Sequence, residues 1–323
     1  MLRKILTSIK EYFVKTDLFL LLVAVVTSAY GMLLISSAVH ASGNMRPLIV
    51  QGLAIIMGIV AYVVITLFDI EHLSFLWKAA FVCNLLLLAT TLFWGVGLET
   101  TGNNSWIRFS IGGVETGIQP GEIGKILFIF TLAKHFKVLG EDINRLRGLI
   151  MLLLHCVVTV AFVYLFSKDD GMALSYLFIF IIMAFAGGIY LRYCTIGLVG
   201  IAAALPFLWT FVFGQYQRDR FIVLFDSTYK LDSVGYHQQQ SLAAIRSGGL
   251  WGDGLYQGTI TQYGYLPTKQ TDFIFSVACE ELGFFGGLVI IVLLCTIIGI
   301  CVAAAFKMRD DKFSMLMCIG IAA

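Results

Sequence analysis

Charged side chains are scarce in this chain of 323 residues: they make up 13% of it, whereas 59% of the residues are hydrophobic. Soluble domains carry about 25% charged residues, so the composition excludes an ordinary soluble globular protein. Apolar runs long enough to cross a bilayer recur along the chain. The composition therefore predicts an all-α polytopic membrane protein, built as a bundle of several helices.

Three other features are missing, and each absence excludes a class. The apolar runs are continuous and lack the alternation of a membrane-spanning β-barrel. The seven cysteines form no CxxC motif and no Cys/His spacing, which indicates small apolar core residues rather than a zinc or redox site. No cleavable signal is visible, because residues 1–17 are charged and the first apolar run is long enough to stay as an anchor.

About eight to nine spans are predicted in a single transmembrane domain over residues 18–323, preceded by a cytoplasmic segment at residues 1–17. The apolar segments are 18–39, 48–68, 73–96, 121–136, 148–166, 171–190, 195–213, 273–306 and 313–323. The segment 121–136 is shorter and partly amphipathic, and the last segment is too short to cross. We therefore expect the C-terminal spans to be missing from this sequence.

Polar intervals separate these segments. The main ones are a Gly/Asn-rich loop at 97–120, a charged turn at 167–170 and a long loop at 214–272. If the N-terminus lies in the cytoplasm, most Lys and Arg residues of the short loops lie on the cytoplasmic side, which satisfies the positive-inside rule. The three polar intervals then share the outer side of the membrane.

The first candidate site residues lie in and just after the loop at 97–120, which contains Trp106. Pro120 fits the first turn of a helix, where its missing N–H costs nothing. Glu122 and Lys125 are three residues apart and share one face of that helix. They form a structural ion pair at the mouth of the bundle, or a polar pair that lines a cavity where Lys125 meets a phosphate; both can hold at once.

The turn and the long loop supply further candidates. Asp169 lies in the charged turn; such turns are commonly structural, but a pair of carboxylates can also bind a cation or anchor the long loop. Near its start the long loop carries Arg218 and Arg220. Later it contains Ser247-Gly248-Gly249, which permits a tight turn and close backbone approach.

Asp272 lies at the predicted start of an apolar helix. The helix dipole stabilises a carboxylate there, so a structural role is one interpretation. A carboxylate at a membrane helix is also a functional-site hypothesis by default, and burial in a cleft would raise its pKa and make it a usable general base. Glu280 lies about two turns further along the helix, with Glu281 beside it.

The residues around Asp272 resemble a known family. The matching residues are Gly235-Tyr236, Gln240-Ser241, Ala244-Ile245, Ser247-Gly248-Gly249-Leu250, Gly252, Gly254, Leu266-Pro267, Thr271-Asp272-Phe273-Ile274-Phe275 and Glu280-Glu281-Leu282-Gly283-Phe284. Supporting matches are Trp106-Ile107, Gln119-Pro120, Glu122, Lys125, Asp169, Gly171 and Ala173. In this order they are similar to the RodA/FtsW/SpoVE family, the SEDS proteins, over roughly residues 50–290.

The resemblance implies a peptidoglycan glycosyltransferase, with about ten spans in the family type. Such an enzyme polymerises lipid II, an undecaprenyl-pyrophosphate-linked disaccharide pentapeptide, at the outer face of the bacterial cytoplasmic membrane. Asp272 matches the family's essential carboxylate and is the expected base of an inverting transfer. Lys125, then Arg218 and Arg220, are candidates for binding the leaving pyrophosphate. Further substrate contacts are expected at Glu122, Trp106, Ser247, Gly248 and Gly249, and supporting roles at Asp169, Glu280 and Glu281.

A divalent cation, Mg or Mn, is left open as a cofactor, with Asp272 and Asp169 as its ligands. The expected partners are lipid II, membrane lipids and a class B penicillin-binding protein transpeptidase, with no nucleic acid. A role in cell shape, division or sporulation is not distinguished. Two rival functions remain: a lipid II flippase or other transporter, and a non-catalytic scaffold of a cell-wall synthesis complex. Polar residues gathered at the outer rim favour chemistry at the surface over transport.

Several positions depart from the family pattern. Arg246 stands where the family usually has Gly, Gly121 replaces Ser, and His237 replaces Gln. The family's late Pro-Thr-Gly and Ser-Tyr-Gly-Gly-Ser signature is absent from the sequence, which ends at Ala323.

Overall fold

The computed structural model of the protein describes residues 17–68, 70–97, 103–111, 114–226, 229 and 234–323. By their contacts, the described residues form two compact units. Unit 1 comprises those within Met1–Thr66 and Gly200–Ile297, and unit 2 those within Leu67–Val199 and Ile298–Ala323. The helices α10 (Leu191–Phe207) and α14 (Ile274–Lys307) contribute residues to both.

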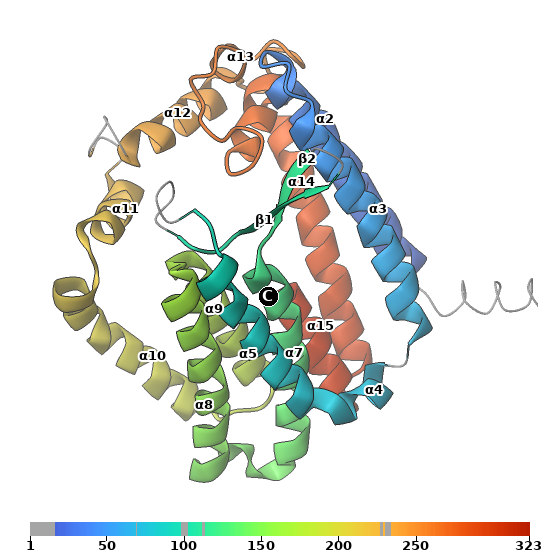
Figure 1. Ribbon diagram of the computed structural model, residues 1–323, viewed down its shortest axis with the longest axis vertical. Coiled ribbons are helices and arrows are strands. Elements are labelled where there is room, and N and C mark those ends of the chain that lie inside the picture. Colours follow the sequence, from blue (N-terminus) through green and yellow to red (C-terminus); the bar gives the residue numbers. More distant parts are fainter. Residues whose placement is uncertain (1–16, 69, 98–102, 112–113, 227–228, 230–233) are drawn as a thin grey trace, which may run out of the picture. The chain divides into compact units, whose positions relative to one another are not determined.

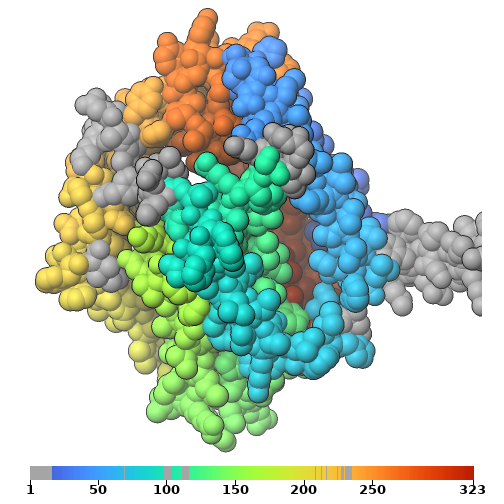
Figure 2. Space-filling view, viewed as in Figure 1, coloured from blue at the N-terminus to red at the C-terminus, as the bar shows by residue number. Residues whose placement is uncertain are grey.

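Unit 1 combines long apolar helices with shorter polar ones (Figure 1). Its further helices are α2 (Leu18–His40), α3 (Arg46–Leu67), α11 (Gln215–Phe225), α12 (Val234–Ser247) and α13 (Thr259–Gln262). The Tyr30 hydroxyl on α2 donates to the Gly286 carbonyl on α14 at 3.0 Å, which joins these two helices. No residue of α3 is buried, and Figure 2 shows this helix at the surface. A helix that is apolar all round and yet exposed is suited to a lipid environment.

Unit 2 is a helical bundle with a small β-hairpin. Its helices are α4 (Ile70–Leu73), α5 (Trp77–Trp94), α7 (Pro120–Leu139), α8 (Leu146–Phe162), α9 (Asp170–Ala186) and α15 (Lys312–Ala322). Ser74–Leu76 and Gly140–Asn144 are short 3-10 helices, and Val163–Ser167 is π-helical. A second π-helical segment, Leu208–Val212, follows α10 and lies in unit 1. The core is formed by large, fully buried side chains, among them Phe128, Phe136, Leu152, Tyr176 and Met183.

Glycines let α7 approach its neighbours closely. The Tyr176 hydroxyl on α9 donates to the Gly121 carbonyl at 2.9 Å. A Cβ added at Gly124 would collide with the Tyr176 hydroxyl and lie 2.8 Å from the Asn84 side-chain oxygen on α5. Inside a bilayer the hydrophobic effect does not drive helices together, so they associate through close van der Waals packing, which small residues permit. The position of Lys125, next to Gly124, thus depends on this close packing.

Six helices are long and apolar enough to cross a membrane, counting only the described residues. They are Leu18–His40, Arg46–Leu67, Ile70–Trp94, Leu146–Ser167, Leu191–Phe211 and Ile274–Lys307. Asp170–Ala186 and Lys312–Ala322 are shorter apolar helices. The sequence predicts about eight to nine spans because it counts these two and α7, whose 20 residues carry Glu122, Lys125, Lys134 and Lys137.

The loop predicted at 97–120 differs from the structure, which has a β-hairpin there. β1 (Ile107–Ile111) pairs antiparallel with β2 (Val114–Ile118), with Ile107 opposite Ile118 and Phe109 opposite Thr116. Branched and aromatic residues at alternate positions on both sides of a Gly-Gly pair favour such a hairpin. The Gly and Asn content of the interval concealed this pattern.

The long interval at 214–272 is also more ordered than the predicted loop. It contains α11, α12 and α13, and residues 248–258 connect α12 to α13. The polar composition indicated a loop because it lacks an apolar stripe. Contacts with distant residues hold these helices: buried carboxylates act at α11 and α13, and Ser241 of α12 hydrogen-bonds to Ser276 of α14. Such tertiary effects are not visible in local composition.

An ionic cluster joins three elements of unit 2. Lys137 Nζ near the end of α7 lies 2.7 Å from Glu71 Oε1 on α4 and 2.8 Å from Asp311 Oδ1 between α14 and α15. Hydrogen bonds with Asp311 and then Glu71 raise the pKa of Lys137. Burial alone would raise the pKa of Asp311, but hydrogen bonds from Lys137 and Ser314 outweigh it and lower that pKa from 3.8 to about 2.

We expect Lys137→Gln to lower the free energy of unfolding by about 1 kcal/mol near neutral pH, because two carboxylates lose their cation. The pKa of Asp311 is depressed in the folded state, so its contribution is complete above about pH 4 and is lost as pH falls toward about 2. Parent and variant should therefore converge in unfolding measurements over that window. Arg145→Gln is the control, since its ion pair with Asp142 is largely exposed. Equal losses in both variants would contradict the special role of Lys137.

Candidate active site

Asp272 lies in unit 1, in the turn that precedes α14. The Thr271 N–H donates to the Thr268 carbonyl at 3.0 Å and closes this turn. Two residues after Asp272, at Ile274, the helix begins. The carboxylate is exposed, and within the part of the chain that the structure describes it has no hydrogen bond or ion pair. Asp272 is therefore available to a substrate, in contrast with the two carboxylates that follow it.

Glu280 and Glu281 are fully buried and bind the polar loop above α14. Glu280 accepts the backbone N–H of Ile260 at 2.6 Å and both the backbone N–H and the hydroxyl of Thr261, at 3.0 and 2.6 Å. Three donors thus satisfy the buried carboxyl group, as a buried polar group requires. Glu280 therefore holds α13 against α14.

Glu281 extends the same network to α2. It accepts the Ser37 hydroxyl at 2.5 Å, the Tyr256 N–H at 3.1 Å and the Gln262 side-chain amide at 2.9 Å. The two neighbouring glutamates thus fasten α2, the loop and α13 to one turn of α14. The sequence predicts only a supporting role for them, without these partners.

A break in α14 allows the loop to dock. At Gly283 the backbone leaves the helical conformation, with φ 69° and ψ −163°. The Asp253 and Gly254 N–H groups donate to the carbonyls of Glu280 and Glu281, both at 2.9 Å. A Cβ at Gly252 or Gly283 would collide with the backbone around the other residue. Glycine is required at both positions because of this contact and their positive φ.

Ser247, Gly248 and Gly249 take part in the same docking. The Ser247 hydroxyl donates to the Ala244 carbonyl at 2.9 Å and completes the end of α12. Gly248 packs so closely on α14 that a Cβ would collide with the Cys279 carbonyl. The Gly249 carbonyl accepts the Phe284 N–H at 2.9 Å. These contacts are with the protein itself, so substrate binding by this trio stays a prediction.

Lys269 is a cation that the sequence interpretation missed. Lys269 lies three residues before Asp272 in the chain. Its ammonium donates to the Thr261 carbonyl at 2.5 Å. Burial lowers the pKa of Lys269, and the charges of Glu281 and Glu280 offset part of that effect. Lys269 thus connects the Asp272 turn to the carboxylate network. The sequence did offer a signal for Lys269, because it is a single basic residue close to Asp272 in a polar stretch.

Arg218 and Arg220 lie on α11, also in unit 1. Arg218 Nη2 donates to the Thr210 carbonyl at 3.1 Å, so part of its guanidinium serves the backbone. Arg220 is exposed. Between them, Asp219 is buried and accepts from Gln215 at 2.9 Å and from Tyr229 at 3.1 Å. The first contact lies within α11 and the second ties the helix to the chain that follows it.

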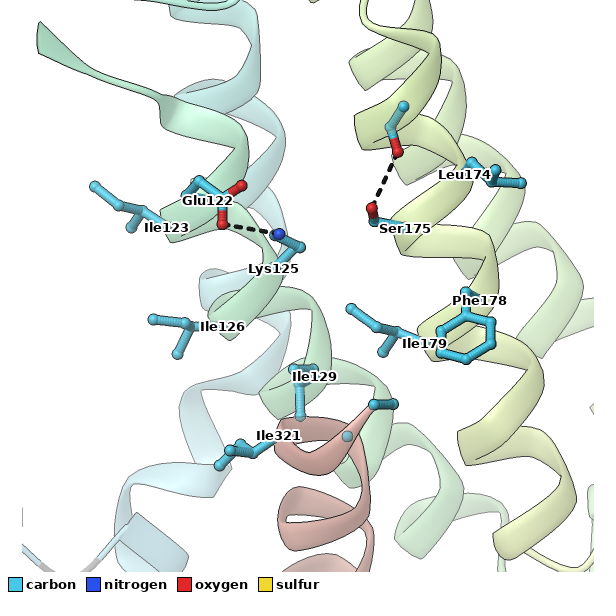
Figure 3. A pocket seen from close by; sticks show the side chains of 13 residues that line it. Glu122, Ile123, Lys125, Ile126, Ile129, Leu174, Ser175, Phe178, Ile179 and Ile321 are labelled. Atoms are coloured by element: carbon cyan, nitrogen blue, oxygen red, sulfur yellow. Dashed lines mark hydrogen bonds and ion pairs between the residues drawn. The ribbon is translucent and has the colours of Figure 1, made fainter. Parts of the chain in front are cut away.

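Unit 2 contains a cavity of about 720 Å³ between α7, α9 and the end of α15. Lys125 Nζ and Glu122 Oε2 form an ion pair at 2.8 Å at its polar end, near Gly171 and Ser175. Figure 3 shows isoleucines and a phenylalanine lining the space beyond this pair. The apolar lining consists of Ile123, Ile126, Ile129, Leu174, Phe178, Ile179 and Ile321. In unit 2 the two residues thus form an ion pair that also lines a cavity, while the phosphate contact of Lys125 stays a prediction.

Asp169 and Trp106 shape the surroundings of this cavity. Asp169 caps α9 by accepting the Met172 N–H at 2.9 Å, and it also accepts from the Gln119 amide at 3.3 Å. It therefore couples the start of α9 to the start of α7. Trp106 precedes β1, its carbonyl accepts the Val96 N–H at 2.8 Å, and the residue is 46% exposed. Asp169 has a structural function here, and its predicted metal role stays a prediction.

A preformed metal site is not found in the described segments, which contain no group of three or more His, Cys, Asp or Glu side chains suited to a metal ion. Asp272 stands alone in unit 1, and Asp169 is already used as a helix cap. A Mg or Mn ion with Asp272 and Asp169 as ligands therefore stays a prediction.

A family model described as "Cell cycle protein", covering FtsW, RodA and SpoVE, matches residues 16–323. The chain belongs to this family. The chain is similar to the peptidoglycan glycosyltransferase MrdB of Escherichia coli strain K12, with 32% identity over 252 residues, 74% of this chain and 62% of MrdB. The stage V sporulation protein E of Bacillus subtilis strain 168 is 30% identical, over 76% of this chain and 64% of that protein. The chain thus spans less than two thirds of the length of these family members.

Solved structures of the family support the fold. A structure reported for the coordination of polymerization and crosslinking by a peptidoglycan synthase complex matches with a TM-score of 0.76 and 25% identity, over 95% of this chain and 82% of that one. RodA of Thermus thermophilus matches with a TM-score of 0.64 and 23% identity, over 95% and 80% of the two chains. The predicted family and the predicted multi-pass, helical membrane fold are confirmed.

Proposed function

We propose that this family member is a peptidoglycan glycosyltransferase that polymerises lipid II. The observation that carries the proposal is the cavity of unit 2, which has an ion pair at one end and apolar walls beyond it. Lipid II likewise has a charged part and an apolar part, because its pyrophosphate is joined to a long hydrocarbon chain. Relatives named peptidoglycan glycosyltransferases lend further support.

Lys125 is the proposed pyrophosphate ligand. Its ammonium is paired with Glu122, a carboxylate whose side chain is 56% exposed, so the pair can open toward an incoming anion. A cation beside a leaving pyrophosphate stabilises the charge that develops as the glycosidic bond breaks. Arg218 and Arg220 stay as further candidates, although Arg218 is partly engaged by the Thr210 carbonyl.

Asp272 is the proposed general base. Its exposed carboxylate takes the proton from the acceptor's GlcNAc 4-hydroxyl as that oxygen bonds to the anomeric carbon of the donor's MurNAc. The bond from this carbon to the pyrophosphate oxygen breaks, and undecaprenyl pyrophosphate leaves with the electron pair. Attack from the opposite face inverts an α-linked donor into a β-linked product. No step is assigned to a metal ion.

In this proposal the protein works in the bacterial cytoplasmic membrane with its N-terminus inside, as the distribution of Lys and Arg indicates. A class B penicillin-binding protein is the proposed partner. A related structure described as a peptidoglycan synthase complex is consistent with such a partner.

Transport of lipid II is the second candidate, because unit 2 buries polar residues on several helices. His135 Nδ1 on α7 lies 3.1 Å from His155 Nδ1 on α8, and Thr131 Oγ1 lies 3.2 Å from His155 Nε2. Asn84 on α5 is buried as well. Polar groups inside a membrane bundle are functional candidates by default. Aromatic rings nevertheless enclose the histidines: Trp77 stacks on His135 at 5.2 Å, which leaves little room for a passing substrate.

Incubating the purified protein with labelled lipid II tests the proposed activity. Glycan strands of increasing length are expected, and they should not form with a folded Asp272→Asn variant. Failure of the folded parent to form strands, alone and with the transpeptidase, would overturn the proposal.

We expect Lys125→Ala to reduce polymerisation about a hundredfold, because the leaving pyrophosphate loses its cation. Lys125→Arg keeps the charge and should recover part of the rate. Arg147→Ala removes an exposed cation from the same unit and should leave the rate unchanged. Strand synthesis at the parent rate by Lys125→Ala would remove Lys125 from the mechanism while leaving the Asp272 assignment standing.

A further inference from the structure

Four large apolar side chains are exposed where the loop docks on α14. They are Leu250 (63% exposed), Trp251 (81%), Phe284 (56%) and Phe285 (47%). The three aromatic residues, with Leu250 beside them, are called here the aromatic collar. The rings of Trp251 and Phe285 are 5.1 Å apart. The Phe284 N–H donates to the Gly249 carbonyl, so loop and helix are bonded directly beside the collar. The collar is therefore one patch, built from two distant parts of the sequence.

The length of α14 gives the depth of this patch in a bilayer. From Phe284 to Phe306 the helix carries no charged residue, and Lys307 follows. The 24 residues from Phe284 to Lys307 extend about 36 Å, against about 30 Å for the hydrocarbon core. Arg309 and Lys312 add positive charge just beyond Lys307. With the basic end at one membrane surface, Phe284 and Phe285 reach the opposite surface.

The break at Gly283 agrees with this boundary. The helix before the break holds Glu280 and Glu281, whose charges are sealed by hydrogen bonds rather than exposed to hydrocarbon. The irregular backbone at Gly283 is tolerated because Asp253 and Gly254 donate to the neighbouring carbonyls. The first part of α14 is thus suited to the watery side, and the part after Gly283 to lipid.

We propose that the aromatic collar is a membrane anchor that lies in the lipid headgroup region. Trp and other aromatic side chains are enriched at that level because it accepts both an apolar ring and a polar N–H. A bilayer fits better than a partner protein because Phe284 and Phe285 open the uncharged run that continues to Lys307. Ring contact with Phe285 then holds Trp251 at the same depth.

The anchor sets the height of the loop above the bilayer. The loop is joined to α14 through Glu280 and Glu281, and α14 begins at Ile274, nine residues before Gly283. At a helical rise this distance is about 14 Å, so Asp272 stands on the water side of the collar. The assignment depends on geometry and hydropathy alone, and it holds whether or not the protein polymerises lipid II.

Fluorescence quenching in proteoliposomes tests the anchor. The parent is compared with Trp251→Phe, a conservative change, and the difference between their emissions isolates the signal of Trp251. Bromine is placed near the headgroup end or near the methyl end of the phospholipid chains, and iodide serves as a quencher in water. A tryptophan octyl ester in the same vesicles provides the interfacial reference.

The Trp251 signal is expected to be quenched at least about twofold more by the shallow bromine than by the deep bromine or by iodide. Quenching mainly by iodide would overturn the proposal, since the collar would then face water and be open to a protein partner. Resistance to all three quenchers would overturn it as well, because protein would cover the ring. The quenching measurements do not depend on glycosyl transfer. A result that contradicts the membrane anchor is therefore distinct from one that contradicts the proposed enzyme activity.

Discussion

Asp272→Asn is expected to lower the rate of glycan synthesis by about 10²- to 10⁴-fold, the usual contribution of a general base. Asn has nearly the same shape but does not accept the acceptor's proton. The exposed carboxylate has no partner among the described residues, so the substitution breaks no contact that would unfold the protein. Initial rates at saturating lipid II, with binding measured separately, would show the loss in kcat.

Asp253→Asn is the matched control. Asp253 is also an exposed aspartate of the docked loop. It bonds to α14 through its backbone N–H, which the substitution leaves in place. Its variant should polymerise like the parent. If Asp272→Asn retained the parent rate, the base would have to be another group, whereas equal losses in both variants would point to the charge of the loop rather than to proton transfer.

Glu280→Ala is expected to loosen the loop by about 3 kcal/mol, because the two N–H groups and one hydroxyl that bond to it lose their acceptor inside the protein. In hydrogen exchange, the amides of Ile260 and Thr261 should then exchange about a hundredfold faster. Glu280→Gln keeps one acceptor oxygen and should fall between parent and Glu280→Ala.

Glu141→Ala removes an exposed glutamate from unit 2 and is the control for a general loss of negative charge. It should leave the exchange of both amides unchanged. Unaltered protection of Ile260 and Thr261 in Glu280→Ala would contradict the view that this carboxylate holds α13 on α14.

Long apolar segments could be predicted from the sequence because the bilayer imposes their length. The predicted segment 18–39 is α2 (Leu18–His40), and 273–306 is α14 (Ile274–Lys307). The family resemblance was also accessible, since Thr271-Asp272-Phe273-Ile274-Phe275 followed by Glu280-Glu281-Leu282-Gly283-Phe284 is a specific match. For Asp272, the predicted position just before a helix agrees with the structure.

Contacts between distant segments could not be predicted. Nothing in the sequence around Ser37 indicates that its hydroxyl bonds to Glu281, 244 residues later. The hairpin of β1 and β2 was hidden by the composition of its interval. The helices α11 to α13 are similar, because contacts made by buried carboxylates fix α11 and α13 and the close approach of Gly248 to α14 fixes the end of α12, rather than an apolar stripe. Local patterns report local preference, whereas these features depend on tertiary partners.

The two candidate functions make different use of the same bundle. A polymerase needs the ion pair and apolar walls of the cavity beside α7, together with a base such as Asp272. A transporter would need the buried polar groups around His135 and His155 to admit a headgroup. The close aromatic packing of these histidines favours the polymerase.

The most direct test reconstitutes the protein in liposomes with labelled lipid II and records glycan strands and lipid II movement between leaflets in the same sample. We expect the parent to form strands without moving lipid II across, and Asp272→Asn to do neither. Movement of lipid II by the parent with no strands formed would contradict the enzyme and establish the transporter instead.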